Sequence, residues 1–396
     1  MAETLISPGV LSRENDQSQI TARPIQAGAA LIGPTVLGRV GIPTLVTTYS
    51  QYLATFGSTF LSGSDEYSFL TSDAAFNYFQ NAGTSLLVTR VASGSFTPAT
   101  SSLVAAQTGS LGNAFTLETL GQGIVMNNTL PAETVGGVLP SGSSDNIRWE
   151  ITNPNLSRGV FSLIIRQGND STNSKSVLES FTNVSLDPKA SNYIARIVGD
   201  TTTNLLGAGT SDPYLQESGS FPNASRYVRV KSVNNPTPDY FDNAGNAKDI
   251  YTGSIPIAQS GSFGGALGDI VTANQNFNQN INNTNTQGLI GINYTDTINL
   301  LANKDDYQYN IISTPGLIYA NATHKTQLDT LISNTENRGD AIIVMDLDNY
   351  ASTVTAVGTV AASLDTSYAA AYWPWLQITD SNSGQLVWVP ASTVIP

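Results

Sequence analysis

The sequence changes character twice along its length. Between residues 93 and 187 it has almost no helical periodicity, and short β-like runs are separated by loops rich in Gly, Ser and Asn. The residues on either side instead alternate helix-like and strand-like patterns. Such a pattern is typical of a β-rich domain inserted into an α/β domain. We therefore predict a multidomain chain of mixed α/β and β class, in which an α/β body carries a nested insertion that resembles a barrel or a sandwich.

The segment before the insertion carries clear helix and strand signals. A helix is predicted over 49–56, because its apolar residues follow the i, i+3, i+4 and i+7 spacing and Gly57 stands where a C-terminal cap is expected. A second helix is predicted over 66–80, and the run 86–91 is typical of a buried strand. This segment is therefore expected to form an α/β unit.

The insertion and the residues after it favour strands and loops. Within the insertion, β runs are predicted at 115–120, 147–152 and 161–166. A capped helix is expected over 187–198. Residues 200–286 then form a second loop-rich stretch, which ends in an Asn/Gln-rich run of low complexity.

From Leu289 the alternation of helices and strands returns. Strands are predicted at 309–313 and 341–345, with a helix that carries Leu328 between them and a weaker helix over 351–364. The expected organisation is an N-terminal arm at 1–20, a first segment of the base α/β domain at 21–92, the β-rich outer domain at 93–187, a middle α/β domain at 188–365 with a loop-rich insertion around 200–287, and a second segment of the base domain at 366–396.

Aromatic residues concentrate near the C-terminal end. Trp373, Trp375 and Trp388 are three of the four tryptophans, and Tyr372 lies beside them. Side chains of this size bury about 150–250 Å² each. We therefore expect these four residues to pack within the body, and any that stays exposed to mark a contact site. The polar turn at 380–384 between two β-like runs predicts a hairpin.

Composition limits the partners and the chemistry of the chain. The formal net charge is −13, and charged residues make up 12% of the sequence, about half of the usual quarter. Direct binding of nucleic acid relies on clustered Lys and Arg, so we expect none. The lack of a long apolar run predicts no membrane insertion. The lack of cysteine excludes disulfides and thiolate metal sites.

Few residues could support catalysis. His324 is the one histidine and is expected to lie exposed near the start of a helix, without the positioned partner that acid–base chemistry needs. Asp346 and Asp348 follow a predicted strand, where α/β enzymes often hold Mg²⁺, so a metal-dependent enzyme is one hypothesis. We favour the alternative that these aspartates cap the next helix and solvate a loop.

Two further runs are expected to be structural. The glycine-rich run 261–268 matches neither phosphate-loop nor dinucleotide-binding spacing and is predicted to be an ordinary loop. Asp305 and Asp306 are predicted to lie in a solvated turn. We therefore expect no catalytic, cofactor-binding or metal-binding residues, no cofactor and no enzymatic activity.

Short motifs in the chain resemble, in order, those of contractile tail sheath proteins. The series starts at Ser7-Pro8-Gly9-Val10, continues at Gly109-Ser-Leu-Gly112-Asn113 and ends at Tyr372-Trp373-Pro374-Trp375. The motifs between and after these are Gly33-Pro34 to Gly38, Pro43-Thr-Leu-Val46, Phe56-Gly57, the run from Ala74 to Val91, Asp187-Pro188 with Asn192-Tyr193-Ile194, Pro315-Gly316, Arg338 to Asp346, and Val389-Pro-Ala-Ser392. The chain resembles sheath proteins of T-even-type myophages, and more distantly those of R-type bacteriocins and type VI secretion systems.

The resemblance implies a structural role. Sheath subunits form hexameric rings that stack helically around a tail tube, and contraction drives the tube through the host envelope for genome delivery. It therefore implies contacts with other copies of this chain, with the tail tube protein, and with baseplate and tail terminator proteins. It also implies a place in the virion tail, after assembly in the cytoplasm of the host bacterium.

The chain departs from the family pattern near its end. Ala391 stands where the family has a second proline. Family members continue with a region that ends in an extended arm, so we expect this chain to lack that region and to be monomeric or weakly associating by itself. An alternative from a different class is a β-rich virion module that binds host glycans or other virion proteins through residues 93–187.

Overall fold

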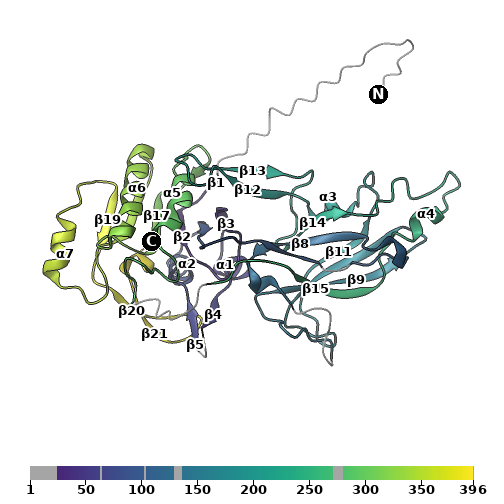
Figure 1. Cartoon of the computed structure of the whole chain (residues 1–396), viewed down its shortest axis with the longest axis horizontal. Coiled ribbons are helices and arrows are strands. Elements are labelled where there is room, and N and C mark those ends of the chain that lie inside the picture. The colour runs from purple at the N-terminus through teal and green to yellow at the C-terminus, as the bar shows by residue number, and fades with distance from the viewer. Residues whose placement is uncertain (1–24, 63–64, 102–103, 129–135, 271–279, 396) are drawn as a thin grey trace, which may run out of the picture.

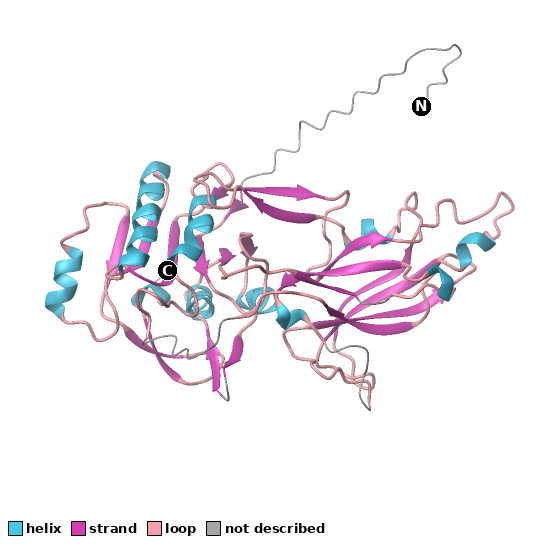
Figure 2. Cartoon of the chain, viewed as in Figure 1, coloured by secondary structure: helices cyan, strands magenta, loops and turns pink. Residues whose placement is uncertain are grey.

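The computed structural model describes residues 25–62, 65–101, 104–128, 136–270 and 280–395, so the arm predicted at 1–20 lies outside the described residues. The molecule is elongated. A six-stranded sheet lies at the left of Figure 1 and a seven-stranded sheet at the right. Helices gather around the first sheet, whereas the second is built mainly from strands and loops (Figure 2). The mixed α/β and β class predicted from the sequence is confirmed.

The six-stranded sheet forms the α/β body. Its order is β19-β18-β17-β2-β6-β3, and neighbouring strands are parallel except β3, which runs antiparallel to β6. The strands are β2 (Ala29–Gly33), β3 (Thr44–Val46), β6 (Leu86–Arg90), β17 (Ile311–Ile318), β18 (Ile342–Asp346) and β19 (Ala369–Tyr372). Segments from both ends of the chain therefore meet in one sheet.

Helices cover both faces of this sheet. They are α1 (Tyr49–Phe56) and α2 (Leu70–Gln80) on one face, and α5 (Thr295–Leu300) and α6 (Ala322–Arg338) on the other. Successive residues of β2 alternate between the two cores, because side chains of a strand point to opposite faces. Ala29 and Leu31 pack with α1 and α2, and Ala30 and Ile32 pack with α5 and α6. A strand covered on both faces is apolar throughout, as β2 is.

The two helices predicted before the insertion are present in the body, and the second begins later than predicted. The helix predicted over 49–56 is confirmed as α1, which Thr48 caps by accepting a hydrogen bond from the backbone N–H of Gln51. The start predicted for the helix at 66–80 is wrong. The residues before Leu70 form β5 (Asp65–Ser68), which pairs with β4 (Thr59–Ser62). Among the described residues, no helix has the length and apolar character needed to cross a membrane.

The seven-stranded sheet forms the β-rich unit and curls into an open half-barrel. Its order is β11-β10-β9-β15-β7-β8-β14, with antiparallel pairs. The strands are β7 (Pro98–Ser101), β8 (Phe115–Gln122), β9 (Ile147–Asn155), β10 (Val160–Gln167), β11 (Val177–Ser185), β14 (Val228–Val233) and β15 (Gln259–Gly264). The three predicted β runs lie in β8, β9 and β10. The sheet also takes β14 and β15 from the stretch expected to be rich in loops, beyond residue 187.

Strand β15 corrects the interpretation of the glycine-rich run 261–268 as an ordinary loop. Residues 261–262 pair with β9 and residues 263–264 pair with β7, whereas residues 265–268 lie in a loop, as predicted. A Cβ on Gly261 would lie 2.5 Å from Cζ2 of Trp149, a buried residue of β9. The glycine is therefore needed because the indole ring packs directly on the backbone of the central strand.

Smaller elements surround the two sheets. The helix predicted over 187–198 is shorter in the structure, because turns occupy residues 187–193 and α3 spans Ile194–Val198. The hairpin of β12 (Thr202–Leu206) and β13 (Tyr214–Ser218) lies between the sheets in Figure 1. The others are β1 (Ile25–Gln26), β16 (Tyr307–Gln308), α4 (Asp249–Thr252), α7 (Val354–Ala361), β20 (Leu376–Thr379) and β21 (Leu386–Val389).

Candidate functional site

Asp346, which the metal hypothesis uses, lies at the C-terminal end of β18 and is 2% exposed. Its carboxylate accepts hydrogen bonds from the backbone N–H of Ser392 at 2.9 Å and from the Ser392 hydroxyl at 2.5 Å. Burial raises the pKa of Asp346 to about 6, although these hydrogen bonds act in the opposite direction. Asp346 therefore anchors the C-terminal turn at 391–393 to the body. The prediction that it caps a helix and solvates a loop is wrong, because the turn covers it.

Asp348 holds the loop that follows β18. Its Oδ1 accepts a hydrogen bond from the backbone N–H of Asn349 at 2.7 Å, and its carbonyl oxygen accepts one from the indole N–H of Trp375 at 3.0 Å. Within the described ranges, no group of three or more His, Cys, Asp or Glu side chains could hold a metal ion. The geometry of both aspartates therefore favours a structural role over the metal hypothesis.

His324 lies in the first turn of α6, as expected, but it is fully buried. Its Nδ1 accepts a hydrogen bond from the backbone N–H of Ile318 at 3.1 Å, so the ring links the end of β17 to the start of the helix. Burial lowers the pKa of His324 to about 4, which leaves the ring neutral at physiological pH. The prediction of an exposed histidine is wrong. Asp305 and Asp306 lie in an exposed turn, as predicted.

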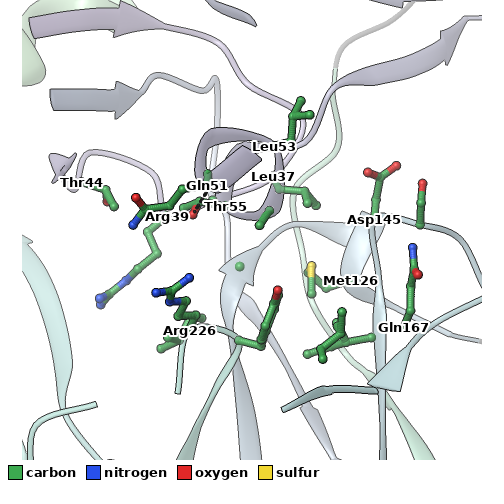
Figure 3. A pocket seen from close by; sticks show the side chains of 18 of the residues that line it. Leu37, Arg39, Thr44, Gln51, Leu53, Thr55, Met126, Asp145, Gln167 and Arg226 are labelled. Carbon is green, nitrogen blue, oxygen red and sulfur yellow. Dashed lines mark hydrogen bonds between the residues drawn. The ribbon is translucent and has the colours of Figure 1, made fainter. Parts of the chain in front are cut away.

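An open cleft of about 520 Å³ lies where the body meets the β-rich unit. Figure 3 shows Leu37 and Leu53 of the body on its upper side and Met126 of the β-rich unit below. The volume lies within the range of about 300–1,000 Å³ typical of sites for small ligands.

The polar groups of the cleft are divided between its two sides. Arg39 and Arg226 stand on one side and Asp145 on the other (Figure 3). Nη2 of Arg39 donates to the carbonyl oxygen of Thr203 at 2.8 Å, so this side chain links the loop after β2 to β12. Burial and the nearby Arg229 guanidinium lower the pKa of Arg39. Burial raises the pKa of Asp145.

Arg90, the last residue of β6, ties the two units together beside this cleft. It is 1% exposed, and its guanidinium donates to the carbonyl oxygens of Gly38 at 2.9 Å, Gln122 at 3.0 Å and Val36 at 3.3 Å. It also lies 4.8 Å from the centre of the Phe96 ring. Burial lowers the pKa of Arg90 to about 10, so it keeps its charge at neutral pH. One side chain thus joins a loop of the body to the end of β8.

The predicted C-terminal hairpin is confirmed. β20 and β21 pair antiparallel around the turn at 380–384. In the described part of the chain, no other strand pairs with either of them. The exposed large apolar side chains of the described C-terminal segment, here called the C-terminal apolar set, are Val354 at 72% exposure, Tyr372 at 38%, Trp373 at 37%, Leu376 at 37%, Leu386 at 67% and Ile395 at 39%. Residues 349–396 carry little charge, with Asp365 and Asp380 as their ionisable acids and no basic residue.

The four aromatic residues that were expected to pack within the body differ in exposure. Trp375 is 6% exposed, and Trp388 is partly buried against Tyr350, with ring centroids 5.4 Å apart. Tyr372 and Trp373 are exposed. The prediction is therefore right for Trp375, partly right for Trp388 and wrong for the other two. Tyr372 is the last residue of the edge strand β19, and Trp373 follows it.

Sequence reasoning did not single out the residues that join the two units. Arg90 has a signal that could have found it, since a charged residue stands in an otherwise buried strand. Arg39 has none, because nothing near it in the sequence indicates that Thr203 will be its partner.

No protein-family model matches the chain, and no curated protein sequence matches it. Solved structures similar to it include two sheath tail proteins. The crystal structure of a sheath tail protein from Listeria innocua aligns over 94% of this chain and 55% of its own, with 10% sequence identity and a TM-score of 0.45. The crystal structure of a sheath tail protein from Desulfitobacterium hafniense aligns over 97% of this chain and 60% of its own, with 11% identity and a TM-score of 0.39. The chain thus spans little more than half the length of these two proteins.

Proposed function

We propose that the chain is a structural subunit of a contractile phage tail sheath. It polymerises helically with other copies around a tail tube and contracts to drive the tube through the host envelope. Its partners are then other copies of itself, the tail tube protein, and baseplate and tail terminator proteins, and it catalyses no reaction. The ordered series of sheath-like motifs along the sequence supports this proposal.

The observation that carries the proposal is the C-terminal apolar set. Leu386 and Val354 are 67% and 72% exposed, in a segment with almost no charge, on a chain whose net charge is −13. Exposed apolar side chains of this size favour coverage by other protein. Acidic subunits can approach each other most easily where their surface is uncharged, because like charges repel.

The unpaired strand edges supply a way to link subunits. The outer edges of β20 and β21, and the outer edge of β19, carry backbone groups that another strand could pair with. Addition of a strand from a neighbour gives main-chain hydrogen bonds, and apolar side chains beside the edge give specificity. If the contact joins two different surfaces, repetition produces an open helical polymer.

The junction of the two units supports movement of whole bodies. Arg90 fixes the β-rich unit to the body through backbone carbonyls, and Arg39 fixes the β12–β13 hairpin to the loop after β2. Such a subunit moves as one body when its contacts with neighbours change. Contraction by rearrangement of subunits needs no nucleotide site.

Sedimentation velocity tests the proposed contact. We expect the chain to associate weakly with rising concentration, and we expect Leu386→Lys to weaken this association because a buried contact would have to desolvate the added charge. The control is Ile250→Lys, at a residue of α4 in the β-rich unit that is 74% exposed. It should associate like the parent chain.

Equal association of the parent chain and the Leu386→Lys variant would contradict a contact through the hairpin. Long tubes formed by this chain alone, seen by electron microscopy, would contradict the expectation of weak association. A glycan-array signal that Leu386→Lys leaves intact, in a chain that stays monomeric, would favour the alternative of a glycan-binding virion module.

A further inference from the structure

A second pocket, of about 320 Å³, lies where the β12–β13 hairpin meets the edge of the β-rich sheet. It is lined by residues of β8, β12 and β14, by Pro98 at the start of β7 and by Arg39 of the loop after β2. Apart from Pro98 and Leu120, the described residues that line it are polar or charged. The pocket therefore fits a polar ligand, in contrast to the cleft that Leu37 and Leu53 line.

Three cationic side chains line this pocket, whereas Glu118 is the one acid among the described residues that line it. Nε and Nη2 of Arg229 donate to Oε1 of Glu118 at 2.8 and 2.5 Å, and Nζ of Lys231 lies 2.9 Å from its Oε2. Arg39 instead donates to the carbonyl oxygen of Thr203 and pairs with no carboxylate of the described residues. The lining thus carries more positive than negative charge.

These cations also have more N–H groups than acceptors. A guanidinium has five N–H donors and an ammonium has three. Nη1 of Arg229 donates to the carbonyl oxygen of Asp200 at 3.1 Å, and Nη1 of Arg39 lies 3.4 Å from the Thr203 hydroxyl oxygen. Within the described ranges, these contacts and those with Glu118 leave several N–H groups for a ligand.

The pKa of Arg39 reflects this excess of positive charge. Burial and the Arg229 guanidinium lower the pKa of Arg39, and the carboxylates of Glu217 and Glu118 act in the opposite direction without cancelling this effect. An anion bound beside Arg39 would favour its charged form. The pocket therefore offers an anion a site where two guanidinium groups repel each other in its absence.

A β-bulge lies at the pocket. Val230 pairs with Leu117 and Ser232 pairs with Thr116, so Lys231 is the extra residue of β14. Bulges are common beside functional sites, where they re-aim a side chain. The side chain of Lys231 is 47% exposed, so its ammonium group is accessible to a ligand from solvent.

We propose that this pocket binds a small molecule with a phosphate group, which Lys231, Arg229 and Arg39 hold by charge-assisted hydrogen bonds. Guanidinium groups match the geometry of phosphate oxygens, and an ammonium adds a point charge. Thr203 and Asn204 line the same pocket and suit the polar remainder of such a ligand. The cations gather in one pocket instead of following a stripe, so the site fits a small ligand and not a nucleic-acid backbone.

Isothermal titration calorimetry of the full chain tests the site, with inorganic phosphate and glycerol phosphate as ligands and sodium chloride of equal ionic strength as the reference. We expect saturable binding of phosphate that chloride does not reproduce. Lys231→Gln should weaken this binding about tenfold, because a hydrogen bond from a charged group is lost. Lys175→Gln is the matched control, since Lys175 is also a partly exposed lysine paired with a carboxylate, that of Glu150, and lies outside the pocket lining. It should bind phosphate like the parent chain.

Glu118→Gln should have the opposite effect. It removes the carboxylate that competes with phosphate for Arg229 and Lys231, so phosphate should raise the thermal unfolding temperature of this variant more than that of the parent chain. Thermal unfolding with and without phosphate measures this difference even if the variant is less stable than the parent. A smaller effect of phosphate on Glu118→Gln would contradict the role of these two cations.

No saturable binding of either ligand up to about 10 mM would overturn the proposal. Equal losses of affinity in Lys231→Gln and Lys175→Gln would overturn it as well. Tighter binding of glycerol phosphate than of inorganic phosphate would support a phosphorylated molecule as the ligand, and the reverse order would support the free ion. The site does not rest on the proposed function, because none of these measurements depends on the association of subunits.

Discussion

The two sheets of this protein bury their polar groups in different ways. The body is a mainly parallel sheet covered on both faces, and its buried acid Asp346 has a hydroxyl partner in Ser392. The β-rich unit instead buries complete ion pairs, in which Arg148 and Arg166 are fully buried. The body thus surrounds buried Asp346 with the hydroxyl and backbone N–H of Ser392, whereas the β-rich unit pairs its buried charges with opposite charges.

The buried network of the β-rich unit is closely connected. Nε and Nη2 of Arg166 bind the two carboxylate oxygens of Asp170 at 2.7 and 2.8 Å, and Nη1 binds Glu150 at 3.0 Å. Nη1 of Arg148 donates to the carbonyl oxygen of Gly137 at 2.6 Å and lies 3.5 Å from Asp170. Such a network fixes one arrangement of strands, but the loss of one member leaves a buried charge without its partner.

The largest expected effect is in this network. Asp170→Asn should lower the free energy of unfolding of the β-rich unit by about 3–5 kcal/mol, because two buried guanidinium groups lose their shared carboxylate. Urea unfolding followed by tryptophan fluorescence measures the change, since Trp149 lies in this sheet. Asp239→Asn removes the exposed pair with Lys189 and should leave the transition unchanged. If both variants lowered the free energy of unfolding by the same small amount, the buried ion pairs of the β-rich unit would contribute no more than an exposed pair. The proposed difference between the two sheets would then be wrong.

A series of pH values tests how a buried acid of the body contributes to stability. The pKa of Asp346 is about 6 in the folded chain against 3.8 ordinarily, so its contribution is complete below 3.8 and is lost as the pH rises through 6. Between pH 4 and pH 7 the parent chain should lose about 2 kcal/mol of stability relative to Asp346→Asn, which imitates the protonated acid. Urea midpoints at each pH measure the difference. A constant difference would show that this acid is ionised throughout.

The smallest expected effects compare two glycines. Gly261→Ala should destabilise the β-rich unit by about 1–3 kcal/mol, because the new Cβ has no room beside Trp149. Gly358→Ala, at an open position of α7 in the body, should stabilise that helix by about 0.5–1 kcal/mol. Thermal unfolding followed by circular dichroism shows whether each variant is more or less stable than the parent chain. A shift in the same direction for both variants would contradict the packing described here.

The sequence predicted local elements better than their partners. The helix at 49–56, the strand at 86–91 and the hairpin around 380–384 follow from periodicity, a capping residue and turn composition, all of which act over a few residues. The start of α2 was placed too early, because the polar run before Leu70 pairs with β4. The burial of His324 and Asp346 could not be predicted, since each is covered by residues whose approach depends on the whole fold.

By itself, the sequence determined that the chain alternates α/β segments with a β-rich region, and it located elements with strong local signals, such as α1, β6 and the β20–β21 hairpin. The tertiary structure alone decided that β14 and β15 complete the β-rich sheet, that Arg90 reaches Gln122, and that Ser392 covers Asp346. Hydrophobic periodicity and helix caps depend on residues that lie within one or two helical turns in the sequence. Sheet partners, burial and the pKa of an acid depend on residues that folding brings together from far apart.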